Sequence, residues 1–165
     1  MNTPWLYSGL SAWRTFTTAL DGARPLAALV ARAYMAQVFF LSGLTKLRDW
    51  DATLLLFTEE YTVPLLPSEV AAIMGTAGEL VLPALLLFGL AGRFAALGLG
   101  VVNAVAVFSL ADIAPAALQQ HITWGVLLAA LALYGVGRWS LDGAWLHPRL
   151  ERWLPAGGAH RLPMN

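Results

Sequence analysis

The chain contains no cysteine and few charged residues, and each shortage excludes a class of function. Of its 165 residues 12% are charged, about half the fraction of a soluble domain, and the ten basic and ten acidic side chains cancel. Without thiols, the protein has no thiol chemistry of its own, no thiolate metal site and no iron–sulfur cluster held by cysteines. A net charge of zero gives no support for nucleic-acid binding.

Apolar residues dominate the sequence instead. They make up 58% of it and gather in four long runs. Each run approaches the roughly 20 residues that a helix needs to cross the hydrocarbon core of a bilayer. The pattern predicts an all-α polytopic membrane protein whose residues 25–142 form a four-helix bundle. We expect the spanning helices at about residues 25–47, 69–90, 94–113 and 121–139.

Segments outside these spans complete the predicted organisation. Residues 1–24 carry Leu10, Trp13 and other apolar side chains at helical spacing, which is typical of an amphipathic helix in the membrane interface. Packing of this helix on the bundle's own face is the alternative. The loop at residues 48–68 contains a helix too short to span, which we expect flat in the interface or re-entrant. Residues 143–165 form the predicted cytoplasmic tail.

Basic residues collect on one side of the predicted bundle. With four spans, the two termini and the turn at residues 89–93 share a side, which holds Arg14, Arg24, Arg93, Arg138, Arg149, Arg152 and Arg161. The opposite side has only Lys46 and Arg48. The positive-inside rule therefore predicts a multi-pass protein of the inner membrane with both termini in the cytoplasm.

Glu79 is the only acidic residue inside the apolar run at residues 70–90, and it falls near the middle of that run. A carboxylate at that depth costs several kcal/mol, so it should face protein or water rather than lipid. At 1.5 Å per residue, the other central polar groups fall within about one turn of its level, and Arg32 comes within expected reach of Glu79. The predicted polar layer consists of Arg32, Gln37, Glu79, Asn103 and Tyr134, with Tyr134 nearest the cytoplasm.

Two interpretations of this layer stay open. In the first, an Arg32–Glu79 pair with amide neighbours holds the helices in register and has no further role. In the second, the layer binds a ligand, a proton or a quinone, since charged groups inside a membrane often mark a site or a pathway.

His121 supports a different hypothesis, because it lies at the outer end of the last predicted span. A single histidine needs further ligands before it can hold a metal or a haem, and the acidic residues of the outer side are the available partners. The predicted outer set is His121 with Glu59, Glu60 and Asp112.

Three motifs resemble those of the DoxX family of small integral membrane proteins. The first follows Arg32 and reads Phe39-Phe40-Leu41-Ser42-Gly43-Leu44-Thr45-Lys46-Leu47. The second joins Gly78-Glu79-Leu80 to Leu87-Phe88-Gly89-Leu90-Ala91-Gly92-Arg93, and the third is Gly135-Val136-Gly137-Arg138-Trp139-Ser140-Leu141-Asp142. The motif positions besides Arg32 and Glu79 are Gly43, Lys46, Arg93, Gly137, Arg138, Ser140 and Asp142.

The resemblance implies a four-helix inner-membrane accessory protein of a redox, metal-stress or oxidative-stress system. The form seen here is similar to members encoded beside metal-responsive peptide-modifying enzymes. A quinone near Glu79 is the expected cofactor, with Glu79 accepting a proton when a quinol is oxidised. The expected partners are the lipid bilayer and other membrane or periplasmic proteins. A homo-oligomer, a non-catalytic scaffold and an outward-facing metal or haem handler are the alternatives, and the sequence does not determine a reaction.

Overall fold

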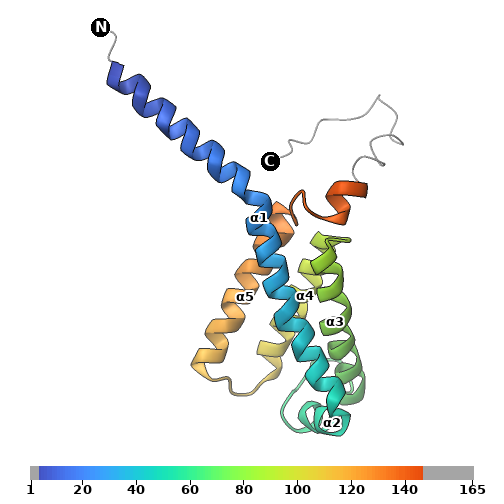
Figure 1. The fold of residues 1–165 in the computed structure, drawn as a ribbon. Coiled ribbons are helices and arrows are strands. Elements are labelled where there is room, and N and C mark those ends of the chain that lie inside the picture. The colour runs from blue at the N-terminus through green and yellow to red at the C-terminus, as the bar shows by residue number, and fades with distance from the viewer. Residues whose placement is uncertain (1–3, 147–165) are drawn as a thin grey trace.

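A computed structural model describes residues 4–146, which are helical almost throughout (Figure 1). The elements in chain order are α1 (Pro4–Arg48), α2 (Trp50–Glu59), α3 (Ser68–Phe88), α4 (Gly92–Ser109), α5 (Pro115–Tyr134) and a short π-helical turn, η1 (Asp142–Leu146). Four of these helices are long and apolar enough to cross a membrane. The predicted all-α polytopic fold is therefore confirmed.

The four long helices pack side by side, and α2 lies against α3 and α1 at the end opposite the N-terminus (Figure 1). Helix α1 packs mainly on α3, α3 on α4, and α4 on α5, which returns to touch α1. Every spanning helix contributes to one apolar core, whose largest buried side chains are Met35, Phe39, Leu86, Leu99, Leu128 and Leu131.

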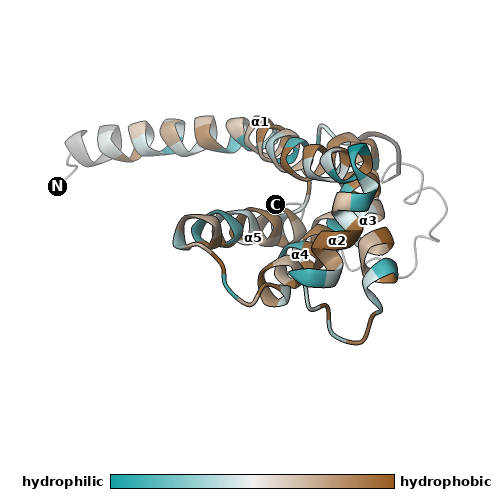
Figure 2. Cartoon of the chain, turned by 90° about the horizontal axis from the view of Figure 1, so that it is seen from below, coloured by the Kyte–Doolittle hydropathy of each residue, from teal (hydrophilic) through white to brown (hydrophobic). Residues whose placement is uncertain are grey.

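Helix α1 is longer than predicted, because it continues through Pro25 without ending. A proline inside a helix removes one hydrogen bond, but good helix formers flank it on both sides. At 1.5 Å per residue, its 45 residues make a helix about 68 Å long, roughly twice the thickness of the hydrocarbon core. Its N-terminal half projects away from the bundle (Figures 1 and 2), so packing on the bundle's own face is wrong. Its placement in the interface stays a prediction.

The boundary between α4 and α5 also differs from the prediction. Helix α4 ends at Ser109, where the carbonyl accepts a hydrogen bond of 2.8 Å from the backbone N–H of Thr62 in the α2–α3 loop. Helix α5 begins at Pro115, because proline suits the first position of a helix. It ends at Tyr134 rather than near residue 139. His121 consequently lies in the second turn of α5 and not at its start.

The segment after α5 folds back and caps the turn between α3 and α4. The carboxylate of Asp142 accepts hydrogen bonds from the backbone N–H groups of Ala91 and Gly92, at 3.0 and 2.8 Å. The Asp142 N–H donates to the carbonyl of Gly89 at 3.0 Å. An acidic side chain at a helix N-terminus satisfies unpaired N–H groups and complements the helix dipole. The predicted tail is described only as far as residue 146.

We expect Gly89→Ala to destabilise the protein by about 1–3 kcal/mol. Gly89 has a φ of +66°, and an added Cβ would lie 2.4 Å from the Cβ of Ser140. Gly100→Ala is the matched control, because nothing lies within 4 Å of its added Cβ. Unfolding of both variants in detergent, followed by circular dichroism, measures the difference. Equal stability of the two variants would contradict the described packing of Ser140 against the turn.

Candidate functional site

Glu79 forms a buried ion pair with Lys46. The Lys46 Nζ lies 2.6 Å from Oε2 of Glu79 and donates a second hydrogen bond of 3.0 Å to Oγ of Ser42. The side chains of Lys46 and Glu79 are 15% and 10% exposed. Ser42 and Lys46 stand four residues apart on α1, so they share a face of that helix. The pair therefore joins the outer half of α1 to the middle of α3.

A close approach of the two backbones makes this pairing possible. A Cβ added to Gly43 would lie 2.9 Å from Cγ of Leu80 and 3.2 Å from the carbonyl carbon of Glu79. Only glycine lets α1 come this near to α3. Pro83 lies four residues after Glu79 inside α3 and has no N–H, so it cannot donate to the Glu79 carbonyl. The helices thus meet where α3 lacks one of its own hydrogen bonds.

Helix α2 covers the outer side of the pair. Phe57 packs over Gly75 of α3 and against the ring of Tyr61, with ring centroids 5.0 Å apart. Thr53 Oγ1 donates to the carbonyl of Lys46 at 2.9 Å and so anchors α2 to the end of α1. Burial raises the pKa of Tyr61, and the negative charges of Glu79 and Glu60 raise that pKa further. The Tyr61 hydroxyl therefore stays protonated at physiological pH.

The ion pair keeps unused hydrogen-bonding capacity. An ammonium has three N–H groups, and Lys46 uses two of them, on Ser42 and Glu79. Oε1 of Glu79 accepts no hydrogen bond from the described residues, and it is not among their fully covered unpaired atoms. The site therefore offers one donor and one acceptor side by side to a ligand.

The expected Arg32–Glu79 pairing is wrong. Arg32 is 2% exposed and donates from its two terminal nitrogens to the carbonyls of Val136 and Trp139, both at 2.9 Å. Those carbonyls lie after the end of α5 at Tyr134, so no backbone N–H of that helix donates a hydrogen bond to them. Arg32 lies on α1 beside the folded-back segment, where these acceptors are within reach. The depth estimate placed it near Glu79 because it ignored the acceptors that the folded-back segment provides.

Two other members of the predicted layer lie outside the bundle. Gln37 faces outward from α1 and is exposed, and Tyr134 is 85% exposed at the end of α5. Neither forms a hydrogen bond with the described residues. The structure therefore brings neither side chain to Glu79.

Asn103 is buried, but it belongs to a second polar cluster between α4 and α5. Its amide donates to the carbonyl of His121 at 3.0 Å, and its Oδ1 lies 2.8 Å from Nδ1 of that histidine. The imidazole packs edge-on against Trp124, whose indole N–H donates to the Tyr34 hydroxyl of α1 at 3.2 Å. This cluster links α4, α5 and α1 in the outer half of the bundle.

The predicted outer metal set is not assembled in the structure. His121 turns toward Asn103, whereas Glu59, Glu60 and Asp112 are exposed. Across residues 4–146, no group of three or more histidines and carboxylates is placed to hold a metal ion. The prediction failed because it placed His121 at a helix end, facing the loops.

The motif positions fall into two groups. Gly43 and Lys46 contact Glu79 near the α2 end of the bundle, whereas Gly137, Ser140 and Asp142 lie with Arg32 at the opposite end. There, Ser140 Oγ donates to the Gly137 carbonyl at 2.7 Å and accepts from the Gly143 N–H at 3.0 Å. Arg93 lies beside Gly135 and is exposed, as is Arg138. Sequence reasoning did not identify Ser42 or Tyr61 as neighbours of Glu79, although the Ser42–Lys46 spacing was a usable signal.

Comparison with known proteins places this arrangement in a family. The DoxX family profile matches residues 27–112, which include both partners of the Lys46–Glu79 pair. This chain belongs to the DoxX family. A protein of Haemophilus influenzae, described only as uncharacterized, is 32% identical over 123 residues, covering 69% of this chain and 80% of that protein. No solved structure matches the chain. The predicted resemblance is confirmed, and this DoxX protein is a multi-pass membrane protein.

We expect Arg32→Lys to destabilise this DoxX protein by about 1.5–3 kcal/mol. A lysine has one nitrogen in place of two, so it cannot reach both carbonyls in the geometry that the planar guanidinium provides. Arg48→Lys on the exposed end of α1 is the control and should leave stability unchanged. Unfolding by increasing denaturant in mixed micelles gives both values. If the two lysine variants unfold alike, the guanidinium does not hold the C-terminal segment.

Proposed function

We propose that this DoxX protein is an accessory protein of a redox or stress-response system in the inner membrane, with both termini in the cytoplasm. We also propose that it binds a quinone at the Lys46–Glu79 pair. The observation that carries the proposal is the buried 2.6 Å ion pair, which has an open donor and an open acceptor at membrane depth. Ionisable groups placed there are costly and are typical of sites.

The donor and acceptor suit both forms of a quinone headgroup. A quinone carbonyl accepts a hydrogen bond from the remaining N–H of Lys46, and a quinol hydroxyl donates to the free oxygen of Glu79. When bound, the quinone supplies the electron transfer. The chain's own residues would orient the headgroup, and Glu79 would take up one of the two protons that a quinol releases on oxidation, with the second passing to the aqueous phase. A redox centre in a partner membrane or periplasmic protein would accept both electrons.

Helix α2 supports this proposal because it packs beside both partners of the pair. Phe57 packs over Gly75, one turn before Glu79, and Thr53 donates to the carbonyl of Lys46. The apolar groove described below does not include Lys46 or Glu79 in its lining. The isoprenoid tail of the quinone therefore lies in the surrounding lipid.

A non-catalytic scaffold is the second candidate, and a specific observation favours it. The buried Arg32 guanidinium and the capping carboxylate of Asp142 bond backbone groups and hold the end of the bundle that faces the segment after α5 together. If the Lys46–Glu79 pair has the same purpose, the protein provides only surfaces for its partners.

A charge exchange separates these two functions. The double variant Lys46→Glu, Glu79→Lys keeps an ion pair between α1 and α3 but reverses the positions of donor and acceptor. We expect it to retain most of the thermal stability and to lose bound quinone. Glu79→Gln should also lose quinone, whereas the exposed Glu59→Gln control should retain it. Native mass spectrometry of protein taken gently from its own membranes measures the retained quinone.

Equal quinone retention in the wild type, the exchange variant and Glu79→Gln would contradict quinone binding at the Lys46–Glu79 pair. A stable wild type that carries no quinone, and to which a short-chain quinone does not bind in lipid nanodiscs, would favour the scaffold. If the exchange variant is unstable, the double variant Lys46→Gln, Glu79→Gln replaces it in the same measurement. That variant removes both charges and keeps a hydrogen bond between the two side chains.

A further inference from the structure

Helix α1 has two opposite faces, and only one of them packs against the bundle. The buried face carries Arg32, Met35, Ala36 and Phe39, which contact the other spanning helices. The opposite face is exposed from Trp13 to Leu41, both within the bundle and on the projecting N-terminal half. The difference between the faces shows that the described part of the chain covers only one face of α1.

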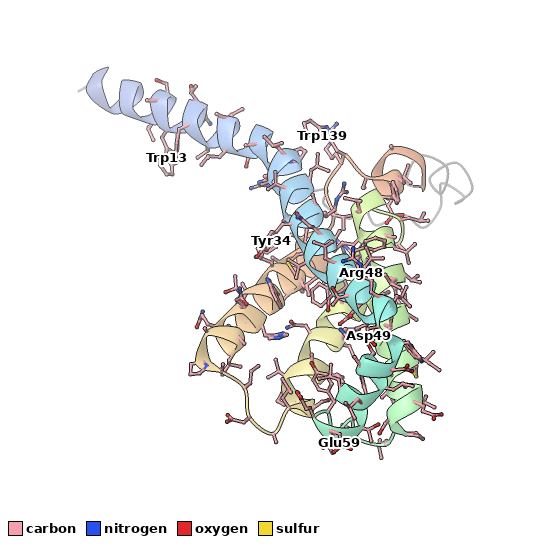
Figure 3. The ribbon with its side chains drawn as sticks, turned by 60° about the horizontal axis from the view of Figure 1, so that its bottom comes forward. Trp13, Tyr34, Arg48, Asp49, Glu59 and Trp139 are labelled. Carbon is pink, nitrogen blue, oxygen red and sulfur yellow. The ribbon has the colours of Figure 1, made fainter. Side chains whose placement is uncertain are left out.

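The exposed face has the spacing of a coiled-coil seam. Its residues alternate in steps of three and four, the pattern of the a and d positions of a heptad repeat. Bulky members such as Trp13, Val30 and Tyr34 are 62%, 59% and 46% exposed. Figure 3 shows Trp13 and Tyr34 on the same side of α1. The seam consists of Trp13, Phe16, Leu20, Ala23, Ala27, Val30, Tyr34, Gln37 and Leu41.

An apolar groove runs along the middle of this seam. It has a volume of about 480 Å³ and is bounded by α1 and by Leu127 of α5. Its floor includes the seam positions Ala23 and Ala27, whose small side chains allow another helix to approach closely. The groove therefore lies along the middle of the seam and extends from the seam to α5.

The exposed amide of Gln37 indicates what kind of partner packs on the seam. It lies about 18 Å from Pro25 and about 17 Å from Arg48 along α1, near the middle of the hydrocarbon core. Its amide is exposed and forms no hydrogen bond with the described residues. An amide facing lipid at this depth leaves donors and acceptors unsatisfied, and such groups in spanning helices bond across to a neighbouring helix.

We propose that α1 of a second copy of this chain packs on the seam, so that the protein is a symmetric dimer with parallel α1 helices. Two copies insert into the membrane in the same orientation, which brings identical residues to the same depth. An amide is both donor and acceptor, so Gln37 of one copy bonds Gln37 of the other without a further partner. Other helices would have to supply a polar group at the matching position.

The projecting half of α1 fits the same arrangement. Trp13, Phe16 and Leu20 continue the seam beyond the bundle, where the described part of the chain offers nothing to pack on them. Two parallel α1 helices bury these side chains against each other. The dimer thereby accounts for a helix roughly twice as long as a membrane span requires.

Single engineered cysteines test the seam in native membranes, because the natural chain contains no cysteine. We expect Val30→Cys and Leu41→Cys, which leave the Gln37 amide in place, to form disulfide-linked dimers on mild oxidation with copper phenanthroline. The controls are Val101→Cys on α4 and Val126→Cys on α5, which are 63% and 65% exposed but lie outside the seam. They should remain monomeric under the same treatment.

A quantitative test uses Gln37→Leu, which keeps the side chain's size and removes its amide. Dimerisation measured by energy transfer between labelled copies in vesicles should weaken about threefold to thirtyfold, and Gln37→Asn should restore part of it. Equal cross-linking at Val101 and Val30, or no dimer at Val30 and Leu41, would overturn the proposal. A cross-linked product with the mass of another protein would also overturn it, because the occupant would then be a different chain. None of these outcomes depends on quinone binding.

Discussion

The structure depends on one constraint, which is that polar groups inside a bilayer need partners within the protein. Lipid offers no hydrogen bonds, so each buried donor or acceptor must find its complement on a neighbouring segment. Lys46 meets Glu79, Arg32 meets two carbonyls, and Asn103 meets His121. These three pairings join α1 to α3, α1 to the segment after α5, and α4 to α5. These polar contacts determine which helices are neighbours. Apolar packing stabilises the bundle but is not directional, so it does not select between alternative arrangements of the helices.

The pairings separate the bundle into two ends with different character. At one end, Arg32 and Asp142 tie the C-terminal segment to the rest of the fold. At the end near α2, Lys46 and Glu79 bond each other while one N–H and one carboxylate oxygen remain open. The unpaired Nε of Arg32 is fully covered, whereas the unpaired Oε1 of Glu79 is not. Residues of the DoxX motifs lie at both ends of the bundle.

Much of this could be predicted from the sequence, and the failures have physical causes. Four apolar runs and the lone Glu79 were enough for the all-α membrane fold and for the importance of that acid. Depth counting named the wrong partner, because it gives the level of a side chain and not the direction in which it points. Lys46 was assigned to the surface because lysines near helix ends usually snorkel. Gln37 was assigned to the polar layer from its depth alone, but its side chain is exposed on the outward face of α1.

The most direct test of the account is a double-mutant cycle between Lys46 and Glu79. The free energy of unfolding in lipid is measured for the wild type, Lys46→Met, Glu79→Gln and the combination, and the same cycle is repeated with Arg32→Met in place of Lys46→Met. The account predicts a coupling energy of roughly 0.5–3 kcal/mol for Lys46 with Glu79, and values near zero for Arg32 with Glu79. Coupling of Glu79 to Arg32, with none to Lys46, would contradict the pairing on which the proposed site rests.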